Sequence, residues 1–482
     1  MTRVLARPSF SSVHEVGQPG ATSRLGRKLR ARRSPRIPVE LWGEVFRWCL
    51  PQDGATTSLS DPPFTFTQVC RFWRAVAFST PRLWASLAID AARLADDEEA
   101  TVAGIRSWLC RSDPLTFALK VRARDNCVRS PRPCLCQFSE LIAANAHRWR
   151  HLKLHLPGDW FDWISFAGGG FTSLSCLSLH SSSFSDSHSS ILDMEWRTLP
   201  PLRQITVSGL MFDPSSLHID YAQITELVIL PQHTLEEGIL FTLDDVLNTL
   251  SQASRLTKLA CLVDDRLLKW KMEVSSNVEE LDLCFKDCGH NWNNPDRQAN
   301  RMRRLDRFFS LLCNPNTRSL SIGYSSTTHL TTTPWPHDSF LSYLSKSSSN
   351  LESLTLKHLP VVETQIIQYL QRAPALTHLT VEVQPMTGSQ RAVGDLLMAA
   401  LTFMDWRCPL VPRLESLDFR NCGRRCSEAA VSFMIETRNV HNLVAKLKTI
   451  KYSASRTPHS LMTKLQELLQ RGFRVDVEVV VQ

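Results

Sequence analysis

"LESLTL" at residues 351–356 and "LTHLTV" at residues 376–381 both place apolar residues at the first, fourth and sixth positions. The last three positions alternate, as expected of a short strand with one buried face. Nine further copies of this six-residue pattern occur along the chain, namely "WRHLKL" at 149, "LSCLSL" at 174, "LRQITV" at 202, "ITELVI" at 224, "LTKLAC" at 256, "VEELDL" at 278, "TRSLSI" at 317, "LESLDF" at 414 and "LKTIKY" at 447. The pattern therefore predicts eleven short strands.

Segments with helical spacing separate these strands, such as "LDDVLNTLSQAS" (243–254) and "FLSYLSKSS" (340–348). The second apolar position of the pattern recurs from Leu152 to Ile450 at an average step of about 30 residues. Alternating helices and strands predict an α/β fold with parallel strands, and this period is typical of an irregular leucine-rich-repeat solenoid. An unrelated α/β domain is the alternative, because only "LESLDFRNC" (414–422) reaches the fuller repeat pattern.

A separate helical unit is predicted before the repeats. In "IPVELWGEVFRWCLP" (37–51), Pro38 fits the first turn of a helix, where its missing N–H costs nothing. Leu41, Val45 and Trp48 then form one apolar stripe on that helix.

A second amphipathic helix is predicted within "QVCRFWRAVAFSTPRLWASL" (68–87), followed by a turn that carries Trp84. Two or three helices of this length bury little surface, and the apolar residues here exceed what so small a bundle can enclose. The excess either packs on the rest of the chain or forms a docking face for another protein.

These two segments resemble an F-box, in the form common among fungal proteins. The likeness lies in Ile37, Pro38, Glu40, Leu41, Val45, Phe46, Val69, Cys70, Trp73, Arg74, Ala77, Ser79, Thr80, Pro81, Leu83 and Trp84. Ile37 departs from the family, where leucine is usual before the proline, whereas the long loop 52–63 is typical of the fungal form. An ordinary helical cap with the same spacing is the alternative.

The resemblance implies a three-helix F-box that binds an Skp-type adaptor and, through it, a cullin–RING ubiquitin ligase. By position, it implies an adaptor-binding face made of Ile37, Pro38, Leu41, Val45, Phe46, Leu50, Val69 and Cys70. Trp73 and Trp84 are expected to hold the helices together or to dock them on the following domain.

The chain divides into four predicted parts: a disordered basic tail (1–36), the F-box (37–88), a connecting helix (89–112) and the solenoid (113–482). The tail contains nine Lys or Arg and one acidic residue, and so carries the whole net charge of +8. A formally neutral body argues against nucleic acid as a partner. "RLGRKLRARR" (24–33) is compatible with a nuclear import signal, a solvated leader or a mitochondrial presequence. We expect a cytoplasmic or nuclear protein.

Motifs for catalysis are not evident in the sequence. It lacks a G-x-S-x-G elbow, a phosphate-binding loop and an H-E-x-x-H motif, so we predict neither an enzyme nor a cofactor. The closely spaced cysteines (134/136, 284/288 and 422/426) do not have the paired spacing of a zinc site, so we predict no metal. No apolar run is long enough to span a membrane.

The variable residue inside each strand should point away from the core, because strand side chains alternate. These residues are Lys153, Ser178, Thr206, Val228, Ala260, Asp282, Ser321, Thr355, Thr380, Asp418 and Lys451. Among them we predict a target-facing set of Lys153, Thr206, Asp282, Thr355, Thr380 and Asp418, against the alternative of a plain solvated surface. The sequence thus predicts a substrate receptor of an SCF-type ubiquitin ligase, or else a non-catalytic scaffold.

Overall fold

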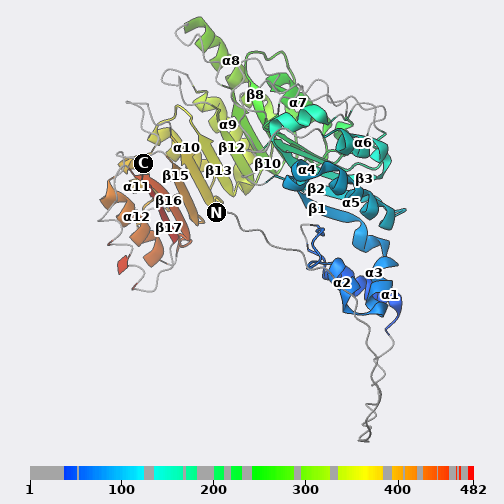
Figure 1. Cartoon of the computed structure of the whole chain (residues 1–482). Coiled ribbons are helices and arrows are strands. Elements are labelled where there is room, and N and C mark those ends of the chain that lie inside the picture. Colours follow the sequence, from blue (N-terminus) through cyan, green and yellow to red (C-terminus); the bar gives the residue numbers. More distant parts are fainter. Residues whose placement is uncertain are drawn as a thin grey trace, which may run out of the picture.

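The strands of the chain form one long parallel sheet in sequence order, seen in a computed structural model (Figure 1). The structure describes residues 37–51, 54–123, 135–164, 166, 170–181, 200–210, 219–230, 241–286, 295–325, 335–383, 393–404, 408–420, 427–441, 443–454, 463, 466–467, 470 and 476–481. The basic tail (1–36) and four of the six closely spaced cysteines (134, 288, 422 and 426) lie outside these residues. The predicted α/β class with parallel strands is therefore confirmed.

Fifteen strands make up the main sheet, and a pair of two-residue strands lies apart from it. The main path runs through β1 (Ser86–Asp90), β2 (Phe117–Arg122), β3 (Trp149–Leu156), β4 (Cys176–Ser181), β5 (Gln204–Ser208), β6 (Glu226–Leu230), β8 (Lys258–Asp264), β10 (Glu280–Phe285), β12 (Ser319–Tyr324), β13 (Ser353–Lys357), β14 (His378–Glu382), β15 (Ser416–Arg420), β16 (Thr449–Ala454) and β17 (Asp476–Val481). β7 (Phe241–Thr242) pairs with β8, while β9 (Val274–Ser275) pairs with β11 (Leu312–Cys313). All eleven predicted copies form strands of the main sheet.

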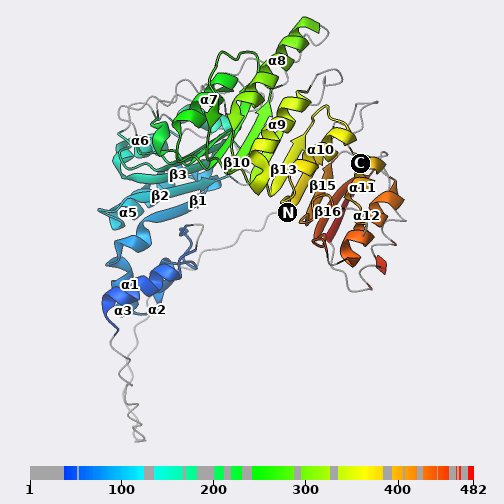
Figure 2. The same cartoon turned by 180° about the vertical axis from the view of Figure 1, so that it is seen from behind.

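The helices form a single layer against one face of this sheet. They are α4 (Ala92–Asp96), α5 (Glu98–Arg111), α6 (Cys136–Ala144), α7 (Leu243–Gln252), α8 (Pro295–Leu311), α9 (His337–Ser347), α10 (Glu363–Arg372), α11 (Asp395–Leu401) and α12 (Glu428–Val440). Figures 1 and 2 show the sheet bending into an arch, with the helices on its outer side. The other sheet face therefore lines the inner side of the arch.

Two predictions near the start of the sheet are wrong. The predicted boundary between the F-box and the connecting helix, at residue 88, falls inside β1. This strand is the first of the main sheet. The predicted connecting helix (89–112) is instead the end of β1 followed by two helices, α4 and α5. The backbone of Asp97 is extended (φ −156°) between these helices, and its carboxylate accepts a hydrogen bond from the Ala100 N–H to cap α5. A capping aspartate therefore divides what the composition suggests is one helix.

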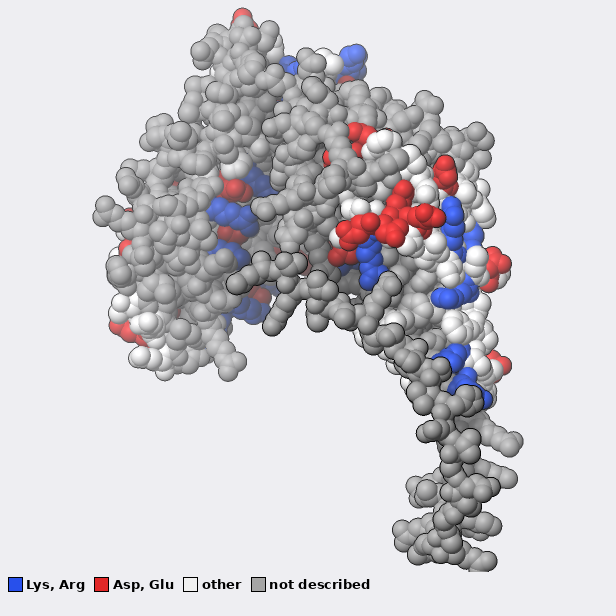
Figure 3. Space-filling view, viewed as in Figure 1, with Lys and Arg blue, Asp and Glu red and all other residues white. Residues whose placement is uncertain are grey.

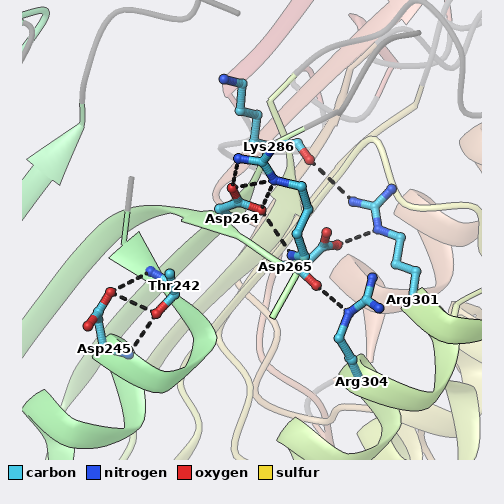
Figure 4. A network of polar contacts seen from close by, with 8 residues as sticks. Thr242, Asp245, Asp264, Asp265, Lys286, Arg301 and Arg304 are labelled. Atoms are coloured by element: carbon cyan, nitrogen blue, oxygen red, sulfur yellow. Dashed lines mark hydrogen bonds and ion pairs between the residues drawn. The ribbon is translucent and has the colours of Figure 1, made fainter. Parts of the chain in front are cut away.

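Polar contacts hold α7 and α8 at the ends of their strands (Figure 4). Thr242 and Asp245 form a reciprocal capping box at the start of α7. Just after β8, the buried Asp265 forms an ion pair with Arg301 of α8, and its carbonyl oxygen accepts a hydrogen bond of 2.7 Å from Arg304. These contacts join α8 to β8 across 36 or more residues of sequence.

Candidate protein-binding surfaces

The first helix of the chain, α1 (Val39–Trp48), is built largely as its sequence predicts. Pro38 precedes it in an extended conformation (φ −52°, ψ 147°), and Glu40 lies in the first turn beside the positive helix end. Leu41, Val45 and Trp48 follow one another along a single stripe, and all three are exposed.

Two short helices follow: α2 (Phe64–Val69) and α3 (Arg71–Phe78). Cys70 separates them with an extended backbone (φ −160°, ψ 170°). Its Sγ accepts a hydrogen bond of 3.4 Å from the Trp73 N–H and so caps α3. The segment for which one helix was predicted, within residues 68–87, therefore contains a break at Cys70 between two helices.

Phe46 is the one predicted adaptor-binding residue that the structure removes from the surface. Its side chain is 1% exposed, stacks on Phe66 with ring centroids 4.4 Å apart, and contacts Trp73 at 4.9 Å. Trp42 lies beside it and also contacts Trp73. Phe46 therefore forms the small core of α1–α3 and cannot offer its ring to a partner.

Trp84 anchors this helical unit to the rest of the chain. It lies in the 3₁₀ turn Pro81–Trp84, is fully buried, and donates its indole N–H to the Ala77 carbonyl oxygen at 2.8 Å. Its ring packs edge-on against Trp108 of α5, with centroids 4.9 Å apart, and under the guanidinium of Arg111. Trp73 is half-buried between α1 and α3. Trp84 thus docks the helices on the following domain.

Exposed large apolar side chains are concentrated in this unit. Nine of the sixteen found among the described residues lie between residues 37 and 78, namely Ile37, Val39, Leu41, Val45, Trp48, Leu59, Val69, Phe72 and Phe78. Leu41 is 54% exposed, Val69 is 59% exposed and Trp48 is 83% exposed. Figures 1 and 2 show α1–α3 projecting from one end of the arch, away from the sheet. We call these nine residues the helical face.

The other predicted adaptor-binding residues lie at or near this face. Pro38 and Cys70 are exposed beside it, while Leu50 is half-buried and packs against the core. Trp48 and Phe72 are additional exposed residues. Phe72 contacts Trp42, with ring centroids 6.3 Å apart, so α3 brings it next to the exposed stripe of α1. The helical spacing of "RFWRAVAF" (71–78) is the signal from which Phe72 could have been assigned to this face.

The predicted target-facing residues lie in one continuous row across the inner sheet face. Backbone register places Lys153, Ser178, Thr206, Val228, Ala260, Asp282, Ser321, Thr355, Thr380, Asp418 and Lys451 side by side on successive strands. Lys120 of β2 and Ala88 of β1 extend this row beyond Lys153. The six residues predicted to face a target are half-buried, as expected for side chains on an open sheet surface.

Basic residues beside the C-terminal half of this row pair with its two aspartates. Arg420 pairs with Asp418 at 2.7 Å, and Lys357 lies 3.8 Å from Asp282. Figure 3 shows basic and acidic side chains interspersed on that wall of the hollow under the arch. The pairing leaves little net charge there.

Clusters of metal-ligating side chains and membrane-spanning helices are absent from the described residues. Across the described ranges, no three His, Cys, Asp or Glu side chains lie together as a metal site requires. Burial raises the pKa of the Cys284 thiol to about 12, which keeps this thiol protonated at neutral pH. In the same part of the chain, no helix is long and apolar enough to cross a membrane.

Comparison with known proteins gives no assignment for these surfaces. No known protein-family profile matches the chain, and no curated protein matches its sequence.

Proposed function

We propose that this chain is a substrate receptor of an SCF-type ubiquitin ligase. In this proposal α1–α3 act as an F-box that binds an Skp-type adaptor, and the sheet with its helices acts as a leucine-rich-repeat-like solenoid that holds a target protein. The resemblance of residues 37–51 and 68–87 to F-box sequences supports the first assignment. The row of aligned strands with a helical outer layer supports the second.

The helical face is the observation that carries the proposal. Trp84 fixes the unit to the chain from one side, and yet nine large apolar residues between 37 and 78 stay exposed. A concentration of exposed apolar side chains on a folded unit is typical of a site for another protein. Each such side chain contributes about 1.5–3 kcal/mol when a partner covers it fully, so five or six suffice for a tight complex after association costs.

The proposed role requires no chemistry from this chain. Binding the adaptor at one end and the target along the arch would raise the effective concentration of target near ubiquitin held by the ligase. The cullin–RING partner would supply the transfer. Figure 1 shows α1–α3 at one end of the sheet, beside its first strands.

Co-expression with an Skp-type adaptor tests the proposal. We expect the full chain to co-purify with the adaptor as one complex, and the double variant Leu41→Asp/Val69→Asp to lose it. Both residues are exposed, so the variant should still fold. The matched control is Leu267→Asp/Leu443→Asp, which places the same charge on two exposed leucines outside the helical face. Loss of the complex in the control as well, or its retention in the first variant, would contradict the proposal.

An assay of ubiquitin transfer distinguishes a substrate receptor from a scaffold. A scaffold would bind the adaptor without directing transfer, so the reconstituted complex would leave every bound protein unmodified. The receptor proposed here requires transfer to a bound target, measured with purified cullin–RING components.

A further inference from the structure

The helical layer has a gap beside the end of α10. In this layer α11 lies between α10 and α12 and contacts both. α10 has ten residues and α12 has thirteen, whereas α11 has only seven and ends at Leu401. Because a helix rises by about 1.5 Å per residue, α11 is too short to cover the last turn of α10.

A pocket occupies this gap. Its volume is about 320 Å³, and it lies between Leu370 and Gln371 of α10 and residues 408–411, which lead into β15. Leu370 and Val411 are buried in its wall, whereas Gln371 and Cys408 are exposed at its rim, so the pocket opens to solvent. Sites for small molecules typically have volumes of roughly 300–1,000 Å³. The pocket is therefore large enough for a small ligand.

The side chains that line this pocket carry no charge. They are aliphatic residues and prolines, apart from the amide of Gln371 and the thiol of Cys408. A charged ligand would lose its hydration in such a pocket without gaining an ion pair. The lining therefore fits an uncharged and largely apolar molecule.

Arg438 of α12 holds the wall formed by residues 408–411. Its guanidinium donates hydrogen bonds to the carbonyl oxygens of Leu410 and Val411, at 3.2 and 2.8 Å, and to that of Leu401 at 2.9 Å. The Arg438 side chain is fully buried, and its Nε has no hydrogen-bond partner. Among the described residues, no carboxylate forms an ion pair with it. The bonds to three carbonyl oxygens fix the path of the chain from α11 to β15.

This wall is costly to maintain. Burial lowers the pKa of Arg438 to about 10, so the side chain still carries its charge at neutral pH, and a buried charge without a counterion is unfavourable. Val411 adopts a positive φ of 44°, which is rare for a β-branched residue. Backbone strain of this kind concentrates at binding sites, where it fixes the shape of the site before the ligand arrives.

The pocket differs from a surface that binds a protein. None of the sixteen exposed large apolar residues in the described part of the chain lines it. A protein interface would require a broader exposed surface. The pocket belongs to the outer helical layer, and Figure 1 shows α10 and α11 far from α1–α3. Neither the helical face nor the inner sheet face therefore accounts for it.

We infer that the pocket between α10 and residues 408–411 binds an uncharged, largely apolar small molecule. The inference goes beyond the proposed function, which assigns no small ligand to this chain. The aliphatic wall would cover the apolar part of the ligand. The Gln371 amide can donate or accept a hydrogen bond at the rim.

Protection of Cys408 from alkylation tests the inference on the full chain. The probe is N-phenyl-1-naphthylamine, and the matched probe is 8-anilino-1-naphthalenesulfonate, which has the same rings and one negative charge. N-ethylmaleimide would label the exposed cysteines, and mass spectrometry would measure the rate at each one. We expect the neutral probe to slow labelling of Cys408 about tenfold, and the sulfonate at the same concentration to slow it less than about twofold.

Two other exposed cysteines are internal controls in the same experiment. Cys110 of α5 lies outside the pocket and should react at an unchanged rate. Cys70 lies beside the helical face, so its protection would report probe bound there instead. An unprotected Cys408, equal slowing at Cys408 and Cys110, or equal protection of Cys408 by the two probes would overturn the inference.

Substitutions at the rim test the site independently. Gln371 is exposed, so Gln371→Trp should fold, and its ring should fill the mouth of the pocket. We expect the concentration of neutral probe that half-protects Cys408 to rise about tenfold. Thr364→Trp is the matched control, because Thr364 is exposed two turns earlier on the same side of α10, and should change this concentration less than about twofold.

Gln371→Glu is a second variant that adds a charge without adding bulk. It should raise the same concentration about threefold, because the probe then displaces water from a carboxylate. Unchanged protection in both Gln371 variants would overturn the inference. Failure here is distinguishable from failure of the proposed function, because the Gln371 variants should still bind the adaptor, and Leu41→Asp/Val69→Asp should still bind the neutral probe at Cys408.

Discussion

Trp84 and Trp149 make the same contact in two helix-to-strand connections, from α3 to β1 and from α6 to β3. The indole N–H of Trp84 donates to the Ala77 carbonyl oxygen in α3, and that of Trp149 donates to the Ile142 carbonyl oxygen in α6, both at 2.8 Å. Trp84 lies two residues before Ser86, and Trp149 lies two residues before His151. Ser86, Ala118 and His151 are register partners on β1, β2 and β3. The helix α3 and strand β1 thus repeat the geometry of α6 and β3, which ties the helical unit into the series of repeats.

Removing the Trp84 side chain should strongly destabilise the protein. Trp84→Ala leaves a large cavity against Trp108 and removes the hydrogen bond to Ala77, so we expect a loss of about 3–5 kcal/mol in the free energy of unfolding. Trp48→Ala is the matched control, because Trp48 is exposed, and should change stability by about 0.5 kcal/mol or less. Urea unfolding would measure both, and similar losses in the two variants would contradict the assigned anchor.

Gly323 in β12 should tolerate no larger residue. A Cβ at this position would lie 2.5 Å from both the Cβ and the carbonyl oxygen of Lys357 on β13. Gly323→Ala should therefore cost about 1–3 kcal/mol by forcing the two strands apart. Gly104→Ala in α5 is the opposite case, since nothing lies within 4 Å of its Cβ, and should stabilise the helix by about 0.5–1 kcal/mol. Thermal unfolding should show shifts of opposite sign.

Breaking the buried ion pair between Asp265 and Arg301 should destabilise the attachment of α8. Arg301→Met leaves a buried carboxylate without its guanidinium, and should cost about 3–5 kcal/mol. The double variant Asp265→Leu/Arg301→Met should be more stable than Arg301→Met, because no charge then stays buried alone. Arg266→Met, which removes the exposed partner of Asp264, should cost about 1 kcal/mol or less. If the double variant were as unstable as Arg301→Met, the lost packing of the two side chains, and not the unpaired buried charge, would account for the destabilisation, which would contradict this prediction.

Acidification should destabilise the folded protein through His155. The unfolded histidine binds a proton near its ordinary pKa of 6.5, whereas the folded one does so only near 4. As the pH falls, the unfolded state therefore binds a proton at His155 before the folded state does. The stability that the neutral His155 allows is complete above pH 6.5 and is lost as the pH falls toward 4. Because the imidazole is half exposed, we expect about 1 kcal/mol of extra loss between about pH 7 and pH 5 relative to His155→Gln. Equal losses in both proteins by urea unfolding would contradict this.

The arrangement of the sheet could largely be predicted from the sequence. An L-x-L alternation at the end of each copy is a local signal, and each copy forms a strand because its two apolar residues must be covered by the helical layer. The row from Lys153 to Lys451 follows from equal positions in successive copies. Its extension to Lys120 depends on the pairing of β2 with β3, where the register shifts between Phe117 and Ala118, and such a shift has no local sequence signal.

The sequence by itself determined the eleven strands of the repeated pattern and the helical character of residues 39–48, since these depend on the spacing of apolar residues along the chain. Only the tertiary structure decided which side of α1 faces inward. Val45 and Phe46 are neighbours of similar hydrophobicity, and Phe46 is buried because Phe66 and Trp73, distant in sequence, fold against its ring. The neighbourhood of Lys120 and Lys153 arises in the same way, because strand pairing places these two residues, distant in sequence, side by side.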